Sequence, residues 1–274
     1  AQADGYVDIP ESQEIVAEGE LIKVRLFGEA PKLSDLVLIG SHCIGVDILL
    51  DCVSRLDPSC SFKVINVGST GGFRAIQRGE ADIAGVHLLD ENTGEYNWPF
   101  IEKYGLEGKA NLIRGYKRVQ GLMIPKGNPL GIKSLDSLLS GKISFINRNP
   151  GSGTRLLIDM LVRKAASKMG LGFRGATETI QGYDTEAKSH SAVALAVKYG
   201  RADVGLGIKA AAISAGLDFL PIGEERYDFL VPSKRLKKES VKSFIEALKS
   251  DEFKIELSKH APGLIADAET GVVM

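Results

Sequence analysis

Two stretches of this chain repeat one pattern. Residues 75–86 and residues 196–207 each read as the end of a helix, a glycine and a strand that opens with Ala-Asp. A polar helix start lies ten residues before each glycine, at Ser69 and at His190. A glycine that ends a helix before a strand is common in α/β proteins. The matching helix starts favour a duplicated unit, and therefore two similar lobes that face each other across a cleft.

Composition and charge narrow the class of protein. The 274 residues suffice for one large domain or two ordinary ones. With 44% hydrophobic and 25% charged residues, the chain is close to a globular average. Its net charge of −1 predicts no nucleic-acid partner and no attraction to an anionic membrane. The basic run at residues 234–238 is interpreted as a surface loop or helix start.

The cysteines and the absence of targeting patterns bear on location. Cys43, Cys52 and Cys60 are odd in number and lack the spacing of a zinc site. Cys43 and Cys52 fall in an apolar helical stretch, which predicts small buried residues. Such cysteine usage suits a reducing compartment. The sequence shows no secretory signal pattern and no apolar run of about 18 residues. We therefore expect a cytoplasmic protein without a membrane partner, although an exported protein loses its signal on maturation.

The first 27 residues differ from the rest. They read as short alternating strands joined by turns, which predicts a β-hairpin. So few residues cannot build a core of their own, so the hairpin must pack on the rest or belong to a larger β domain. Residues 28–34 are interpreted as a linker.

From residue 35 the pattern alternates between strands and helices, which predicts an α/β fold with mainly parallel sheets. Expected strands are residues 35–39, 62–67, 82–86, 112–116, 120–124, 142–146, 203–206, 219–222 and 227–231. Expected helices are residues 44–56, 71–78, 98–104, 134–139, 154–169, 190–199, 209–215, 240–249 and 251–259.

The chain is expected to pass between the lobes twice. One crossing is placed near Lys117 and Arg118, and the return near residues 223–225. The C-terminal helices then complete the first lobe. This predicts a first lobe formed by residues 35–117 plus 225–274 and a second lobe formed by residues 118–224, with residues 1–27 as a separate piece.

Four polar loops precede expected helices. A helix start exposes unpaired N–H groups and a partial positive charge, so it attracts anions. The alternative for each loop is ordinary capping, because Ser and Thr are common N-cap residues. Parallel strands place such loops on one edge of a sheet, which favours a shared anion site. The loops are residues 40–42, 68–72, 149–155 and 189–191.

The loop at residues 149–155 is the most specific of the four. It is rich in glycine and hydroxyl groups, and Arg155 adds a permanent charge suited to a bidentate contact with an oxyanion. The alternative for Arg155 is an ion pair with a nearby acidic residue.

Histidines and hydroxyls give no recognisable catalytic or metal motif. His42, His87 and His190 are far apart in sequence and lack a ligand spacing, so hydrogen bonding to a ligand or a loop is favoured over metal ligation. No nucleophile elbow, P-loop or dinucleotide fingerprint is present. We assign no catalytic residue, no metal and no cofactor.

Together these motifs resemble a known family. Residues from about 35 to 274 are similar to the periplasmic-binding-protein-like domain related to molybdate- and tungstate-binding proteins. The resemblance implies a two-lobed type II periplasmic-binding-protein-like α/β fold that closes on a tetrahedral oxyanion. The motifs that carry it are residues 40–42, 68–72, 78–82, 150–155 and 200–207.

A second, shorter resemblance concerns the N-terminus. Residues 3–6, 9–10 and 17–20 are similar to the last strands of molybdopterin molybdenumtransferase. That enzyme and this binding domain are known as fusions, so the resemblance implies the C-terminal part of a longer protein. None of the transferase's catalytic residues is carried over.

The resulting hypothesis is a binding module for a small anion, molybdate or tungstate, that serves molybdenum or tungsten cofactor biosynthesis. Arg155 and His190 depart from the neutral sites of several oxyanion binders and leave room for a larger anion such as a pterin phosphate. The alternatives are an enzyme or regulatory lobe acting on such a precursor, and the effector domain of a transcription regulator. The predicted ligand-binding residues are Ser41, His42, Ser69, Thr70, Ser152, Thr154, Arg155 and His190.

Overall fold

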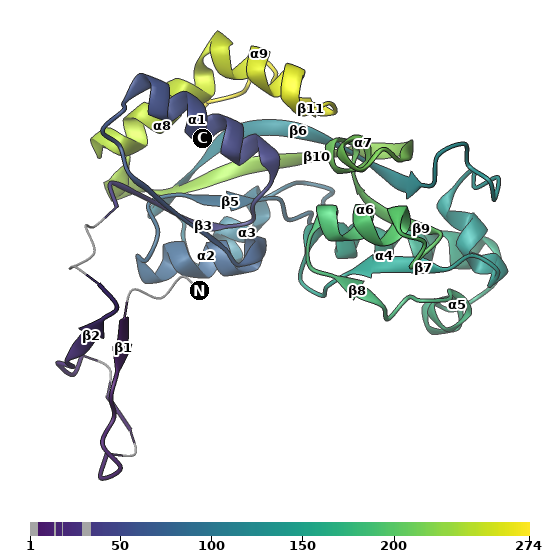
Figure 1. Ribbon diagram of the computed structural model, residues 1–274, viewed down its shortest axis with the longest axis horizontal. Coiled ribbons are helices and arrows are strands. Elements are labelled where there is room, and N and C mark those ends of the chain that lie inside the picture. The colour runs from purple at the N-terminus through teal and green to yellow at the C-terminus, as the bar shows by residue number, and fades with distance from the viewer. Residues whose placement is uncertain (1–4, 14, 18, 29–33) are drawn as a thin grey trace.

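Two lobes are joined by a pair of long antiparallel strands, β6 (Ala110–Ile124) and β10 (Asp218–Pro232), which run from one lobe into the other (Figure 1). The computed structural model describes residues 5–13, 15–17, 19–28 and 34–274. The fold is mixed α/β with a short N-terminal β-hairpin, as the sequence predicts. The predicted residue boundaries of the two lobes stay predictions.

β6 and β10 differ from the sequence-based expectation. Each was expected as two short strands interrupted by charged residues, but each is one strand of 15 residues. Arg118 and Glu225 lie opposite each other in register and form a buried ion pair, so each charge is compensated inside the sheet. Both strands can therefore continue through the predicted crossing points. β10 carries register shifts after Pro221 and after Tyr227.

In the first lobe, helices cover both faces of the sheet. α1, α8 and α9 pack on one face in one apolar cluster, and α2 and α3 pack in another with β5. The elements are β3 (Leu36–Gly40), α1 (Ile44–Leu56), β4 (Phe62–Asn66), α2 (Gly68–Arg78), β5 (Ala84–Val86), α3 (Trp98–Lys103), η2 (Ser233–Arg235), α8 (Glu239–Lys249), α9 (Asp251–His260) and β11 (Leu264–Ile265).

The second lobe has its own two apolar clusters. One packs η1, α4 and α5 against the sheet, and the other packs α6 and α7. α5 has no counterpart among the expected helices, and β7 extends two residues beyond the end of the expected strand. The elements are η1 (Leu135–Ser140), β7 (Phe145–Arg148), α4 (Gly153–Lys168), α5 (Phe173–Thr179), β8 (Glu186–Ala187), α6 (His190–Lys198), β9 (Val204–Ile208) and α7 (Lys209–Ala215).

The sheets are less parallel than predicted. The main sheet has the strand order β5-β10-β6-β9-β7-β8, with β11 beside β6. β7 is parallel to β8 and β9, and β3 is parallel to β4, but every pairing of β6 and of β10 is antiparallel. The long pair of strands between the lobes accounts for the difference.

The repeated sequence pattern corresponds to a repeated structure. Gly79 and Gly200 both end a helix with positive φ, at 75° and 67°. The aspartates that follow play equal parts: Asp82 Oδ2 accepts from the Val37 N–H at 3.0 Å, and Asp203 Oδ2 accepts from the Ser144 N–H at 2.8 Å. Each aspartate thus fixes the start of the neighbouring strand. Asp82 also holds the predicted basic surface run, through Lys238 at 2.7 Å and Arg235 at 3.4 Å.

The predicted hairpin consists of β1 (Gly5–Val7) and β2 (Val24–Leu26), which pair antiparallel. It extends away from the lobes (Figure 1), and its apolar side chains are exposed, including Ile15, Leu21 and Phe27. Most of the predicted linker at residues 28–34 lies outside the described residues.

Cys43 and Cys52 are buried, as the sequence predicts, and Cys60 is buried as well; all three are free thiols. Within the described ranges, none of the helices combines the length and apolar character that a membrane crossing demands.

Candidate functional site

A cleft of about 370 Å³ lies where the starts of α1, α2, α4 and α6 converge from the two lobes. Its floor is polar, because strand ends and helix starts bring backbone and hydroxyl groups to the same place. The lining residues are Ser41, His42, Asn66, Val67, Gly68, Ser69, Thr70, His87, Arg148, Asn149, Pro150, Gly151, Ser152, Lys188, Ser189 and His190.

The structure brings six of the eight predicted site residues together at this cleft. They come from loops on both lobes that are far apart in the sequence, as the duplicated pattern predicts. That they bind a ligand stays a prediction. The six are Ser41, His42, Ser69, Thr70, Ser152 and His190.

Thr154 and Arg155 do not line the cleft. Thr154 is buried in the first turn of α4, where its Oγ1 lies 3.4 Å from Gln120 Nε2. Arg155 pairs with Asp159 at 2.9 Å and with Glu186 at 3.3 Å. The structure therefore places Arg155 in the acidic pairing that the sequence left open as its alternative.

The helix starts at the cleft are not equivalent. Ser152 caps α4 by accepting from the Arg155 N–H, and Ser189 caps α6 by accepting from the Ala192 N–H. These two serines fit the ordinary capping role. In contrast, α2 begins in the predicted polar loop, three residues earlier than expected, and no side chain caps it. Its first N–H groups therefore remain available to an anion.

Ser69 in the first turn of α2 has a different role from a cap. Its Oγ accepts from the His87 backbone N–H at 3.0 Å. Because that bond uses an oxygen lone pair, the hydroxyl proton of Ser69 remains free to be donated into the cleft.

Arg148 is the functional candidate that the sequence analysis missed. It ends β7, is 93% buried, and its Nε donates to the Ala187 carbonyl at 3.1 Å. Burial, followed by repulsion from Arg118, lowers its pKa to about 10, so it stays charged at neutral pH. A basic residue between an apolar strand and a glycine-rich loop is the signal that could have found it.

The charge of the lining is one-sided. Arg148 and Lys188 are cationic, and none of the described lining residues is an Asp or a Glu. His190 lies 3.3 Å from the Arg148 guanidinium, and burial together with Arg148 holds its pKa well below the usual range. The cleft thus offers permanent positive charge and hydroxyl donors to a ligand.

A buried charged group lies directly behind the cleft. Glu225 pairs with Arg118, and its Oε2 also lies 3.3 Å from His87 Nδ1. Burial alone would raise the pKa of Glu225, but Arg118 and then His87 outweigh it, so the pKa falls well below the usual range. The other ring nitrogen of His87 lies 2.9 Å from Ser41 Oγ. Ser41 at the cleft is therefore linked through the His87 ring to Glu225, which lies in β10 between the lobes.

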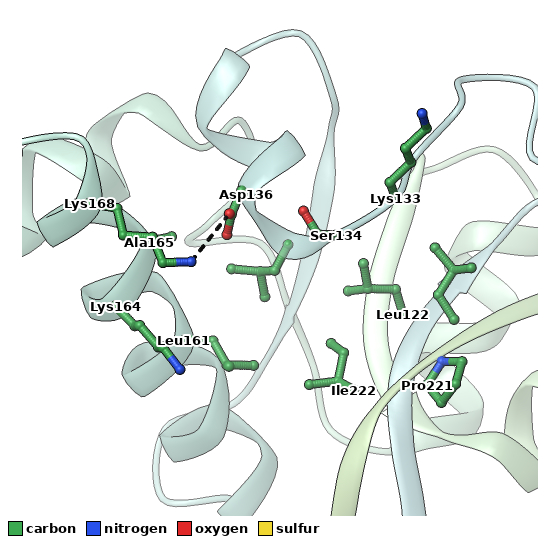
Figure 2. A pocket seen from close by; sticks show the side chains of 12 residues that line it. Leu122, Lys133, Ser134, Asp136, Leu161, Lys164, Ala165, Lys168, Pro221 and Ile222 are labelled. Carbon is green, nitrogen blue, oxygen red and sulfur yellow. Dashed lines mark ion pairs between the residues drawn. The ribbon is translucent and has the colours of Figure 1, made fainter.

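A separate cavity of about 280 Å³ lies in the second lobe, between η1, α4 and β10. Figure 2 shows an apolar floor, with the lysines at its rim and Lys168 reaching toward Asp136 at 3.9 Å. None of the predicted site residues lines it. Among the described residues, no group of three or more His, Cys, Asp or Glu side chains is arranged to hold a metal ion.

The fold and the cleft define a two-lobed protein of the type II periplasmic-binding-protein class. The family description "PBP superfamily domain" matches residues 51–249. The chain therefore belongs to the PBP superfamily.

Two curated relatives are similar in sequence. The uncharacterized protein YvgK of Bacillus subtilis is 33% identical over 226 residues, which cover 81% of this chain and 68% of the relative. An uncharacterized HTH-type transcriptional regulator of Methanocaldococcus jannaschii is 33% identical over 270 residues, which cover 88% of this chain and 82% of the relative.

Solved structures share the fold at low sequence identity. A putative phosphate transporter substrate-binding protein of Clostridium perfringens has a TM-score of 0.60 at 16% identity, with 85% of this chain and 99% of that chain covered. A tungstate ABC transporter protein of Geobacter sulfurreducens has 0.58 at 17%, with 82% and 97% covered. The sulfate-binding protein SubI of Mycobacterium tuberculosis has 0.61 at 14%, with 82% and 85% covered.

Proposed function

We propose that this chain is a binding module for a small tetrahedral oxyanion, held between the lobes without chemical change. The observation that carries the proposal is the lining of the cleft. Arg148, Lys188, the uncapped start of α2 and the hydroxyl proton of Ser69 converge there, and no described carboxylate lines it. A doubly charged anion gains charge-assisted hydrogen bonds in such a site.

We propose molybdate or tungstate as the ligand. The fold is shared with a phosphate transporter protein solved with bound phosphate, a tungstate transporter and a sulfate-binding protein. The loop motifs resemble those of molybdate- and tungstate-binding proteins. In this proposal Ser41, Ser69 and Thr70 donate from the first lobe, and Arg148 supplies the charge from the second. His42, Ser152 and His190 complete the wall of the cleft.

The context proposed for this binding is molybdenum or tungsten cofactor biosynthesis in the cytoplasm. Its support is the resemblance of residues 1–27 to the end of a molybdopterin molybdenumtransferase, fused to or partnered with this domain. A small hairpin with exposed Ile15, Leu21 and Phe27 is consistent with a strand pair from a larger β domain. A binding assay between this chain and a separately produced transferase tests the partnership, and absence of binding by the intact chain would remove it.

A thermal-shift screen of the intact chain tests the proposed ligand. Molybdate or tungstate should raise the melting temperature, because a ligand that binds the folded state stabilises it by mass action. Sulfate at equal concentration should raise it less. If no tetrahedral anion shifts the transition, the chain is not an oxyanion-binding module.

A second candidate use of the same cleft is the effector domain of a transcription regulator. The observation that favours it is the archaeal relative, described as an HTH-type regulator, which matches over 88% of this chain. In that role the anion would act as a signal. Molybdate-dependent DNA binding by the full natural protein would support this use, and DNA binding that ignores the anion would oppose it.

A further inference from the structure

His87 sits between a carboxylate and a hydroxyl. It follows β5, is buried, and places Nε2 2.9 Å from Ser41 Oγ and Nδ1 3.3 Å from Glu225 Oε2. Its ring stacks on Tyr227, with centroids 5.8 Å apart. Because Ser41 lines the cleft and Glu225 lies in the strand pair between the lobes, His87 joins the two.

The ionised Glu225 determines where the imidazole proton lies. Arg118 holds Glu225 as a carboxylate, and a bare Nδ1 facing it at 3.3 Å would set two lone pairs against each other. Nδ1 therefore carries the single proton of neutral His87, which leaves Nε2 as an acceptor. Nε2 of neutral His87 therefore accepts a hydrogen bond from the Ser41 hydroxyl. With its proton engaged in this way, Ser41 presents only oxygen lone pairs to the cleft.

A protonated imidazole reverses this arrangement. With a proton on each ring nitrogen, Nε2 donates to Ser41 Oγ, and the hydroxyl proton turns toward the cleft. Only this second state lets Ser41 donate to an oxygen of a fully deprotonated dianion. The orientation of the Ser41 hydroxyl therefore depends on one proton at His87.

The surroundings of His87 keep the empty cleft in the neutral state. Burial, then the positive charge of Arg118, lowers the pKa of His87 against the opposing pull of Glu225. Arg148 acts in the same direction as Arg118. The remaining neighbours add no further charge at neutral pH: His190 is held neutral, the stacked phenol of Tyr227 has its pKa raised, and the adjoining start of α4 presents Gly153. A bound dianion adds negative charge next to this group and favours the imidazolium.

We propose that Glu225, His87 and Ser41 form a proton relay, so that the cleft takes up one proton from solvent with each fully deprotonated dianion it binds. The proton ends on His87 Nε2, and no covalent bond of the ligand changes. This proposal rests on the proposed function and adds to it a means of reading the protonation state of the anion. Glu225 and His87 act as positioning residues, because Ser41 makes the contact.

Isothermal titration of the intact chain with molybdate tests the relay. At about pH 8, the observed enthalpy is compared in Tris and in HEPES, whose ionisation enthalpies differ. We expect uptake of about one proton per anion, and an affinity that falls about tenfold per pH unit as the pH rises. Binding without proton exchange would overturn the relay alone. No binding of any tetrahedral anion would overturn the proposed function and the relay with it.

Variants separate the relay from a structural role of His87. His87→Gln cannot take up a proton, so we expect binding that is weaker, free of proton uptake and independent of pH. His260→Gln is the matched control, because His260 lies on α9 and pairs with Glu256; it should keep the full uptake. Uptake that persists in His87→Gln would overturn the relay. If that variant fails to fold, the comparison of Tris and HEPES with the unchanged chain still shows whether a proton is taken up on binding.

Discussion

At the scale of single residues, the two arginines that flank the glycine-rich loop have opposite surroundings. Arg148 is buried at the cleft, whereas Arg155 is engaged by Asp159 and Glu186 outside it. The two residues carry the same charge and flank the same loop, but the groups that surround their side chains differ. The balance of acidic partners, rather than the residue type, decides which arginine can serve an anion.

Arg148→Gln should weaken molybdate binding by roughly 10- to 100-fold, because a hydrogen bond to a charged group contributes about 1.5–3 kcal/mol. Isothermal titration measures the loss. Arg174→Gln is the matched control, because Arg174 is exposed on α5 and pairs with Glu178. An affinity that Arg148→Gln leaves unchanged would exclude a ligand contact at this position.

Acid should destabilise the anion-free chain before its carboxylates titrate. His87 and His190 have lowered pKa values in the folded state, so the unfolded state binds more protons below about pH 6.5. The stability they contribute is present above that pH and is lost as the pH falls toward the folded-state values. We expect a loss of up to ~1.4 kcal/mol per pH unit for each histidine.

Urea unfolding at several pH values between about 7.5 and 5 measures this loss. His190→Gln should make the dependence on pH shallower, because one of the two titrating groups is removed. A free energy of unfolding that stays constant over this range would contradict the burial of neutral histidines.

The sequence marks the hydroxyl residues of the cleft more clearly than it marks Arg148. Ser41, Ser69 and Ser152 follow strands in polar loops, and that position alone predicts an edge of a sheet. The expected strand ends at residue 146 and the expected polar loop begins at residue 149, so Arg148 falls between the two predictions. Its burial depends on the Ala187 carbonyl and His190, which lie about 40 residues away in sequence.

At the scale of elements, close backbone contact holds β5 beside the loop that follows β3. A Cβ on Gly85 would lie 2.0 Å from Tyr227 Oη and 2.6 Å from the Ser41 carbonyl oxygen. The same phenol donates a hydrogen bond to that carbonyl. The position of Ser41 therefore depends on the absence of a side chain at residue 85.

Gly85→Ala should lower the free energy of unfolding by about 1–3 kcal/mol, because the added methyl group overpacks the site. Gly175→Ala, in helix α5 with open space around its Cβ, is the control and should stabilise the chain by up to ~1 kcal/mol. Denaturant unfolding compares the two variants. Equal effects would mean that β5 and the β3 loop are not in tight contact.

Helices were better predicted than strands. The expected bounds of α1 and α7 agree with the structure. In both helices the apolar residues repeat with the period of a helix, and the pattern stops where the helix ends. β6 and β10 were wrongly divided, because a charged residue inside a strand signals a surface when its partner is unknown. Arg118 and Glu225 are more than 100 residues apart, so neither local pattern reveals the pairing.

At the scale of the whole molecule, the two lobes and their connection favour a hinge. β6 and β10 are the long elements that pass between the lobes (Figure 1). Across the lobes, Arg163 of α4 pairs with Glu91 at 3.2 Å. Both side chains are nearly half exposed to solvent, so this pair adds little resistance to motion.

Molybdate should reduce the radius of gyration of the chain, because an anion that contacts both lobes favours the closed arrangement. Small-angle X-ray scattering with and without saturating anion measures the change, and Arg148→Gln at the same concentration serves as the control. A radius of gyration that is identical in both states, although the anion is bound, would exclude closure.

The two-lobed architecture could be predicted from the repeated pattern. In each lobe a glycine ends a helix, at Gly79 and Gly200, and an aspartate fixes the start of the neighbouring strand, at Asp82 and Asp203. The antiparallel pairing of β6 and β10 could not be predicted in this way, because these segments lie outside the repeated sequence pattern.

The central claim is that an oxyanion sits between the lobes, and tungsten makes its position directly visible. A crystal grown with tungstate and measured at the tungsten absorption edge should show one strong anomalous peak in the cleft, with the surrounding tungstate oxygens within hydrogen-bonding distance of Ser69 and Arg148. A peak only in the lysine-rimmed cavity of the second lobe, or no ordered peak at all, would contradict the assignment of the cleft.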